Sequence, residues 1–124
     1  MRNILILCGV VLVIGTGLLV RALRVPTQYG AFAQAARVEV ADVIASPKKF
    51  LHKTIALEDV IRKQCTSMGC YFFFQAGDQF LRIELAEIAM HAPKKHDGRK
   101  ARVEGQLIPY GDGYQVIATA VEFE

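Results

Sequence analysis

An uncharged apolar run near the amino terminus constrains this chain more than any other feature of its sequence. The run spans seventeen residues from Ile4 to Val20, and arginines flank it at Arg2, Arg21 and Arg24. As a helix it would be about 25 Å long, slightly less than the ~30 Å hydrocarbon core of a bilayer. The long arginine side chains can reach the interface and cover the difference. We therefore predict a transmembrane signal anchor over residues 1–25.

Cleavage of this segment as a secretory signal peptide is the alternative. Ala31-Phe32-Ala33 has the small-x-small form that signal peptidase accepts. However, the thirteen residues from the end of the apolar run through that motif include two arginines and Pro26, so the cleavage region would be long and basic. The uncleaved anchor is the preferred interpretation. A neighbouring membrane helix could approach it closely at its glycines, Gly9, Gly15 and Gly17.

Charge is balanced outside this segment. The chain has 15 basic and 12 acidic residues, and three of the basic ones flank the apolar run, so the remainder carries equal numbers of both. A general nucleic-acid binder needs net positive charge to displace counterions from phosphates. We therefore expect no nucleic-acid partner.

The rest of the chain divides into a short connecting segment and one domain. Residues 26–36 contain turn formers and small residues without periodicity, so they are expected to form a tether. From Arg37 onward the pattern changes to period-two alternation enriched in β-branched and aromatic residues, which indicates strands. We therefore expect a single β domain over residues 37–124, with room for one small core.

Five strands and a short helix are expected in this domain. A first turn or helix ends at Ser46-Pro47, the later helix is expected at 86–91, and the strands are expected at 54–65, 70–75, 80–85, 100–110 and 114–123. A helix between the third and fourth strands is the order of an OB-fold, a five-stranded Greek-key barrel. We therefore predict an all-β, OB-fold-like Greek-key barrel preceded by one transmembrane helix. Gly105, inside the fourth strand, suits the bulge at which one strand joins both sheets of such a barrel.

Two cysteines bracket the hairpin between the first two strands. Cys65 and Cys70 are separated by four residues, and Gly69 is free to take a positive φ, so the two sulfurs can face one another. In an oxidising compartment a disulfide is the preferred interpretation. A thiol site is the alternative, in which Cys65, Met68 and Cys70 would bind copper as Cu(I) or exchange thiols. A reduced, inert pair is the third possibility.

Four stretches of the domain carry a resemblance to a known family: residues 42–50, residues 53–58, the hairpin Cys65-x3-Gly69-Cys70-Tyr71, and residues 98–105. Together they resemble an uncharacterised family of bacterial periplasmic OB-fold proteins, whose members have a Cys-x3-Gly-Cys-Trp hairpin and a later Val-Glu-Gly strand. This sequence has Tyr71 in place of that tryptophan, and Asp59 where the family has glycine after Leu-Glu. The resemblance implies a fold and a compartment, because the family has no established activity.

The order of an anchor followed by an OB-type barrel is also similar to the haem chaperone of cytochrome c maturation. That protein attaches haem through a histidine in a His-x3-Tyr setting. Here Lys95 follows His91 at that spacing, and Lys100 follows His96. We therefore expect no haem.

Membrane orientation does not follow from charge, because arginines flank both ends of the apolar run. The short amino-terminal tail and the cysteine pair favour a domain outside the cytoplasm. We expect a single-pass protein of the bacterial inner membrane with its carboxy-terminal domain in the periplasm.

Two surface patches are candidates for partner binding. Residues 71–74 are four consecutive aromatics; alternation places two of them in the core and leaves Tyr71 and Phe73 outside, where they could contact a partner. Stacking of bases on this strand is the less favoured interpretation. A basic patch, either solvated or in contact with lipid phosphates or an acidic partner, contains Lys94, Lys95, His96, Arg99, Lys100 and Arg102, of which Lys94, Lys95, Arg99 and Arg102 are the candidate partner-binding residues.

The sequence contains no recognisable catalytic constellation. Glu58 and Asp59 are adjacent on a predicted strand, so they point to opposite faces and cannot act as an acid/base pair. We expect no enzyme activity, no cofactor and no small-molecule substrate. The expected function is that of a non-catalytic accessory or docking subunit of a larger membrane protein complex. The alternative is a periplasmic copper-binding or thiol-exchange module.

Overall fold

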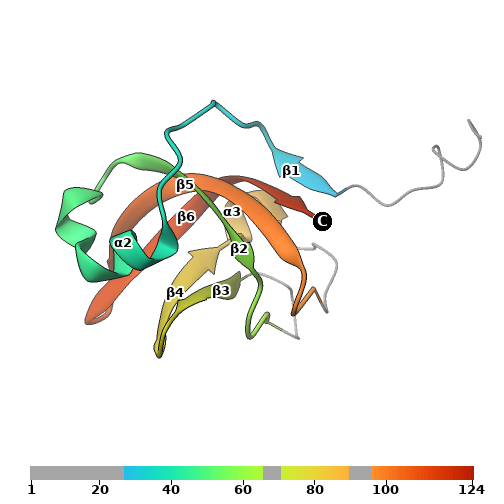
Figure 1. Ribbon diagram of the computed structural model, residues 1–124. Helices are drawn as coiled ribbons and strands as arrows, with labels where there is room; N and C mark the ends of the chain where they lie inside the picture. Colours follow the sequence, from blue (N-terminus) through green and yellow to red (C-terminus); the bar gives the residue numbers. More distant parts are fainter. Residues whose placement is uncertain (1–26, 66–70, 90–95) are drawn as a thin grey trace, which may run out of the picture.

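The computed structural model describes residues 27–65, 71–89 and 96–124, which form a mainly β structure (Figure 1). This part of the chain contains an open 6-stranded sheet in the order β2-β5-β6-β4-β3, with β1 paired to β6 beside that path. The strands are β1 (Gln28–Gly30), β2 (Thr54–Val60), β3 (Tyr71–Ala76), β4 (Gln79–Glu84), β5 (Lys100–Tyr110) and β6 (Gly113–Phe123). The helical segments are α2 (Val40–Ala45), the 3-10 turn η1 (Pro47–Lys49) and α3 (Ala86–Ala89).

The strand pairing brings the two ends of the sheet toward each other. β2, β5 and β6 pair antiparallel, β6 pairs parallel with β4, and β4 pairs antiparallel with β3. Just after β2, the N–H groups of Arg62 and Phe73 each donate to the other's carbonyl oxygen over 2.8 Å. α2 packs against β2, β3 and β4. The all-β prediction is confirmed.

The predicted strands are present with small differences in their bounds. The fourth strand has the predicted limits, Lys100 to Tyr110, whereas the first ends at Val60 rather than at residue 65. After Val60 the N–H of Ile61 still donates to the carbonyl oxygen of Arg99, just before β5, over 2.8 Å. The next residue, Arg62, pairs with Phe73 of β3, and Lys63 then takes a left-handed φ of 48°. The regular strand is therefore shorter than predicted because the chain turns at Lys63.

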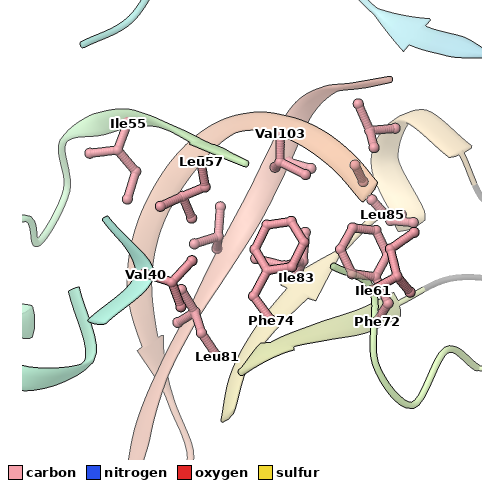
Figure 2. Close-up of a cluster of buried hydrophobic side chains, with 14 of the residues drawn as sticks. Val40, Ile55, Leu57, Ile61, Phe72, Phe74, Leu81, Ile83, Leu85 and Val103 are labelled. Atoms are coloured by element: carbon pink, nitrogen blue, oxygen red, sulfur yellow. The ribbon is translucent and has the colours of Figure 1, made fainter. Parts of the chain in front are cut away.

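The core follows from alternation along these strands. Ile55, Leu57 and Ile61 are buried as predicted. Phe72 and Phe74 come from β3, with ring centroids 5.2 Å apart, and lie among the aliphatic side chains of the other strands (Figure 2). Full burial of each such side chain contributes roughly 1.5–3 kcal/mol. This single core places the odd-numbered residues of β3, such as Tyr71 and Phe73, on the outer face.

Gly105 is the site of the predicted bulge. The register between β5 and β6 shifts between Glu104 and Gly105. A β-carbon at position 105 would collide with the carbonyl oxygen of Ile117 on β6. Because only glycine allows this approach, the residue lets β5 bend and pair with β2 on one side and β6 on the other.

Residues 27–38, here called the strap, include most of the segment that the sequence predicted as a tether. The strap begins as β1 on β6, where Gly30 has a φ of 72° and a β-carbon would collide with the carbonyl oxygen of Thr119. It reaches β2 at its other end, where the N–H of Val38 donates to the carbonyl oxygen of Ala56 over 3.0 Å. The strap is therefore bound to the sheet at both ends. Backbone pairing of this kind carries no local sequence signal.

We predict that Gly105→Ala lowers the free energy of unfolding by about 1–3 kcal/mol, since the added methyl group overlaps the backbone of β6. Gly113→Ala is the matched control, because a β-carbon there meets nothing closer than 3.9 Å. Its effect should stay within about 0.5 kcal/mol. Urea unfolding curves measure both changes, and equal effects of the two substitutions would contradict the bulge assignment.

Candidate functional site

An array of aromatic side chains lies on the outer face of β3 and β4. Tyr71 and Phe73 project from β3, and Phe80 projects from β4. The ring centroids of Tyr71 and Phe73 are 5.9 Å apart, and those of Phe73 and Phe80 are 6.0 Å apart, both in edge-to-face geometry. We call these three residues, together with Tyr110 at the end of β5, the aromatic face. Both partner-binding aromatics that the sequence singled out, Tyr71 and Phe73, belong to it.

Arg82 lies in the centre of the aromatic face. Its guanidinium carbon is 4.0 Å from the ring centroid of Tyr71 and 4.9 Å from that of Tyr110. Its Nε donates to Oε1 of Gln115 over 3.1 Å, and its Nη2 donates to Oε2 of Glu84 over 2.8 Å. Only 19% of the Arg82 side chain is exposed, and its guanidinium contacts both tyrosines. Sequence reasoning missed this residue, because Gln115 comes next to it only through the parallel pairing of β4 and β6.

A second cation lies at the edge of the aromatic face. The ammonium of Lys63 is 4.0 Å from the ring centroid of Phe80. Among the described residues, Phe80 and Tyr110 are the large hydrophobic side chains that remain exposed, at 37% and 50%. Cation–π contacts of this kind contribute about 0.5–1 kcal/mol at exposed sites. The aromatic face therefore combines exposed apolar area with two cations that are already in position.

The strap is attached to the outer side of β5 through a buried carboxylate. Glu104 is 2% exposed, and its two carboxylate oxygens accept hydrogen bonds from the N–H of Ala33 over 2.6 Å and from the N–H of Ala35 over 2.9 Å. Gln34 between them has a φ of 61°, which lets both N–H groups point to one anion. Sequence reasoning missed Glu104, because its role depends on a segment 69 residues away in the chain.

Two cation contacts support this attachment. The guanidinium carbon of Arg102 is 4.1 Å from the ring centroid of Phe32, and Arg37 forms an ion pair of 3.4 Å with Glu58 of β2. Arg102 also pairs with Glu122 over 3.7 Å. The structure thus places one member of the predicted basic patch, Arg102, against the strap.

The remaining basic-patch and cysteine positions are only partly described. Arg99 is exposed, whereas Lys94 and Lys95 lie outside the described residues. Cys65 is half-buried, and its N–H donates to the carbonyl oxygen of Tyr71 over 2.8 Å. Met68 and Cys70 lie outside the described residues, as do the anchor glycines Gly9, Gly15 and Gly17. The disulfide and the copper site therefore stay predictions.

Two features of the described residues bear on metal and membrane chemistry. Over 27–65, 71–89 and 96–124, no three His, Cys, Asp or Glu side chains come together as a group that could hold a metal ion. Within the same ranges, no helix has the length and apolar character to cross a bilayer.

His96 has an unusual environment beside the carboxy-terminal strand. Its ring stacks on Phe123 with centroids 4.5 Å apart, and neither ring nitrogen has a hydrogen-bond partner in the part of the chain that the structure describes. Burial lowers the pKa of His96, and the positive charge of Arg99 lowers this pKa further. Folding therefore disfavours the protonated form of His96, whose ring packs against Phe123.

Comparisons with known proteins show similarity of fold. The chain matches no protein-family model and no curated protein. One similar solved structure is that of a putative aspartyl-tRNA synthetase from Leishmania major, with a TM-score of 0.52, 9% identity, and coverage of 75% of this chain and 21% of that chain. Another is the hypothetical protein ygiW from E. coli, with a TM-score of 0.52, 7% identity, and coverage of 77% of this chain and 99% of that one. The chain thus spans about a fifth of the length of the first, and both likenesses support the β-rich, OB-type fold.

We predict that Glu104→Ala lowers the free energy of unfolding by about 1–3 kcal/mol, because it leaves the N–H groups of Ala33 and Ala35 without their acceptor. Hydrogen exchange at these two amides should accelerate. Glu122→Ala is the control: it removes a carboxylate from an exposed ion pair and should cost about 0–1 kcal/mol. Unchanged exchange at both strap amides would show that Glu104 does not hold the strap.

We predict that His96 makes the domain less stable in acid. Since the pKa of His96 is lowered on folding, the unfolded chain takes up a proton first as pH falls below about 6.5, and stability declines through that window. His96→Phe keeps a ring on Phe123 but has no proton to bind. Lowering the pH from 7.5 to 5.5 should therefore reduce the unfolding free energy of the wild type more than that of the variant. Parallel pH profiles would refute this role.

Proposed function

We propose that this chain is a single-span, membrane-anchored periplasmic protein whose OB-type domain docks on a larger membrane protein complex without catalysing a reaction. The observation that carries the proposal is the aromatic face, with Arg82 fixed between Tyr71 and Tyr110. Aromatic and arginine side chains contribute most of the binding energy in protein interfaces. Side chains that are already ordered lose little conformational entropy on binding. The aromatic face therefore suits a protein partner.

The OB-type barrel is the framework for this proposal. The order of the strands, the position of α3 between β4 and β5, and the Arg62–Phe73 pairing support closure of the sheet into such a barrel. In this arrangement, β3 and β4 present one continuous outer face. The aromatic face lies on that surface, whereas the strap covers β5 at Glu104.

The strap would orient the domain relative to the membrane. The proposed anchor ends two residues before Thr27, whose carbonyl oxygen accepts a hydrogen bond from the N–H of Phe123 over 2.8 Å. Because the strap is bound from this point onward, the domain would have little freedom to rotate about the anchor. The aromatic face would then meet the complex in a defined direction.

The carboxylates next to these features support a non-catalytic role. Glu84 holds Arg82, Glu104 holds the strap, and Glu58 pairs with Arg37. Each is engaged in a structural contact. The alternative of copper binding or thiol exchange depends on Met68 and Cys70, which lie outside the described residues, and it stays an alternative.

We predict that Lys63→Glu combined with Phe80→Ser reduces recovery of the partner complex about tenfold or more, because each change removes a contact of roughly 1 kcal/mol or above. Both side chains lie on the surface, so the fold should persist. Lys48→Glu, an equal charge change at an exposed position of η1 outside the aromatic face and the basic patch, is the control. The measurement is co-purification of the tagged full chain from detergent-solubilised membranes. Full recovery with the double variant, or turnover of a substrate by the purified chain alone, would contradict the proposal.

A further inference from the structure

A groove with a volume of about 700 Å³ lies at the end of the sheet near α2. Ala36 and Val38 of the strap and the half-buried Phe50 supply its apolar lining, and three lysines surround it, namely Lys48, Lys49 and Lys53. Pockets that bind small ligands have volumes of about 300–1,000 Å³. The groove is thus large enough for a ligand and lies apart from the aromatic face.

The local sequence explains why the lysines gather there. η1 begins at Pro47, two residues after the end of α2. The N–H of Phe50 donates to the carbonyl oxygen of Pro47 over 3.0 Å. The N–H of Lys53 donates in turn to the carbonyl oxygen of Phe50 over 3.0 Å. The N–H of His52 donates to the carbonyl oxygen of Leu107 on β5 over 2.8 Å, which attaches the whole turn to the sheet. The lysines are therefore carried by an ordered backbone.

The charge around this groove is uncompensated. None of the ion pairs among the described residues includes Lys48, Lys49 or Lys53, and no acidic side chain lines the groove. A second groove, of about 310 Å³ beneath the strap, differs in this respect, because its arginines Arg37 and Arg102 pair with glutamates. Unpaired cations around an apolar floor are complementary to a ligand that is both anionic and apolar.

We propose that this groove binds a free anionic amphiphile, an unbranched alkyl chain that ends in a carboxylate or a phosphate monoester. The apolar floor of Ala36, Val38 and Phe50 receives the chain, and the lysines receive the headgroup. A lysine ammonium is a compact point charge that does not require a planar partner, so either headgroup fits.

The position of the groove favours a free ligand over a bilayer. α2 lies at one end of the sheet, whereas β1 and the carboxy terminus lie at the other (Figure 1). The proposed anchor precedes β1. If the chain enters the membrane there, as the proposed function requires, the groove faces away from the lipid surface. The ligand would then reach the groove from solution.

Photolabelling of the full chain in phosphatidylcholine nanodiscs tests this proposal. A photoreactive decanoate should label the segment from 36 to 55. Decanoate and decyl phosphate should compete with it, and decyltrimethylammonium should not. Competition should strengthen about two- to fourfold for each methylene added between octanoate and decanoate.

Variants separate the groove from non-specific uptake. Lys49→Gln with Lys53→Gln should weaken labelling about two- to fivefold per lysine, whereas Lys100→Gln, the same change outside the groove, should leave it unchanged. Labelling outside 36–55, equal competition by the cationic amphiphile, or no response to the lysine variants would overturn the proposal. Labelling by a photoreactive phosphatidylglycerol in vesicles but not by free decanoate would overturn it in favour of bilayer contact. None of these results depends on recovery of the partner complex, so failure of the groove and failure of the docking proposal are distinguishable.

Discussion

The close approach of β6 to Gly105 is the constraint on which the rest of the structure depends. A side chain at this position would push β5 and β6, the two longest strands, apart. Because glycine has no side chain, β5 can bend here and pair with both β2 and β6. The bulge lies directly after Glu104. The carboxylate of Glu104 lies on the outer side of β5 and accepts hydrogen bonds from the two strap amides. Two adjacent residues thus set the curvature of the sheet and the path of the amino-terminal segment.

The aromatic face depends on the same pairing. The register of β5 with β6 places Tyr110 opposite Gly113, at the hairpin that ends both strands, and the parallel register of β6 with β4 places Gln115 opposite Arg82. Arg82 can therefore contact Tyr110, Gln115 and Tyr71, which come from three strands. A shift of either register would separate these contacts, so the surface is a product of the sheet rather than of β3 alone.

Local patterns in the sequence predicted the features that depend on alternation along a strand or on the properties of glycine. The burial of Ile55, Leu57 and Ile61, the outward position of Tyr71 and Phe73, and the bulge at Gly105 all follow from period two and from the properties of glycine. The strap, Arg82 and Glu104 could not be found in this way. Their partners are distant in sequence, as with Arg82 and Gln115, which are 33 positions apart, and no single segment shows that such groups will meet.

The distribution of charge shows why overall composition is an incomplete guide to partners. The domain has equal numbers of basic and acidic residues, which argues against a general affinity for polyanions. However, several of its carboxylates are engaged within the fold: Glu58, Glu84 and Glu122 pair with arginines, and Glu104 binds backbone amides. The lysines of η1 and the loop after it have no such partners among the described residues. A domain whose basic and acidic residues balance therefore presents a locally cationic groove, because folding pairs its acidic groups with other parts of the molecule.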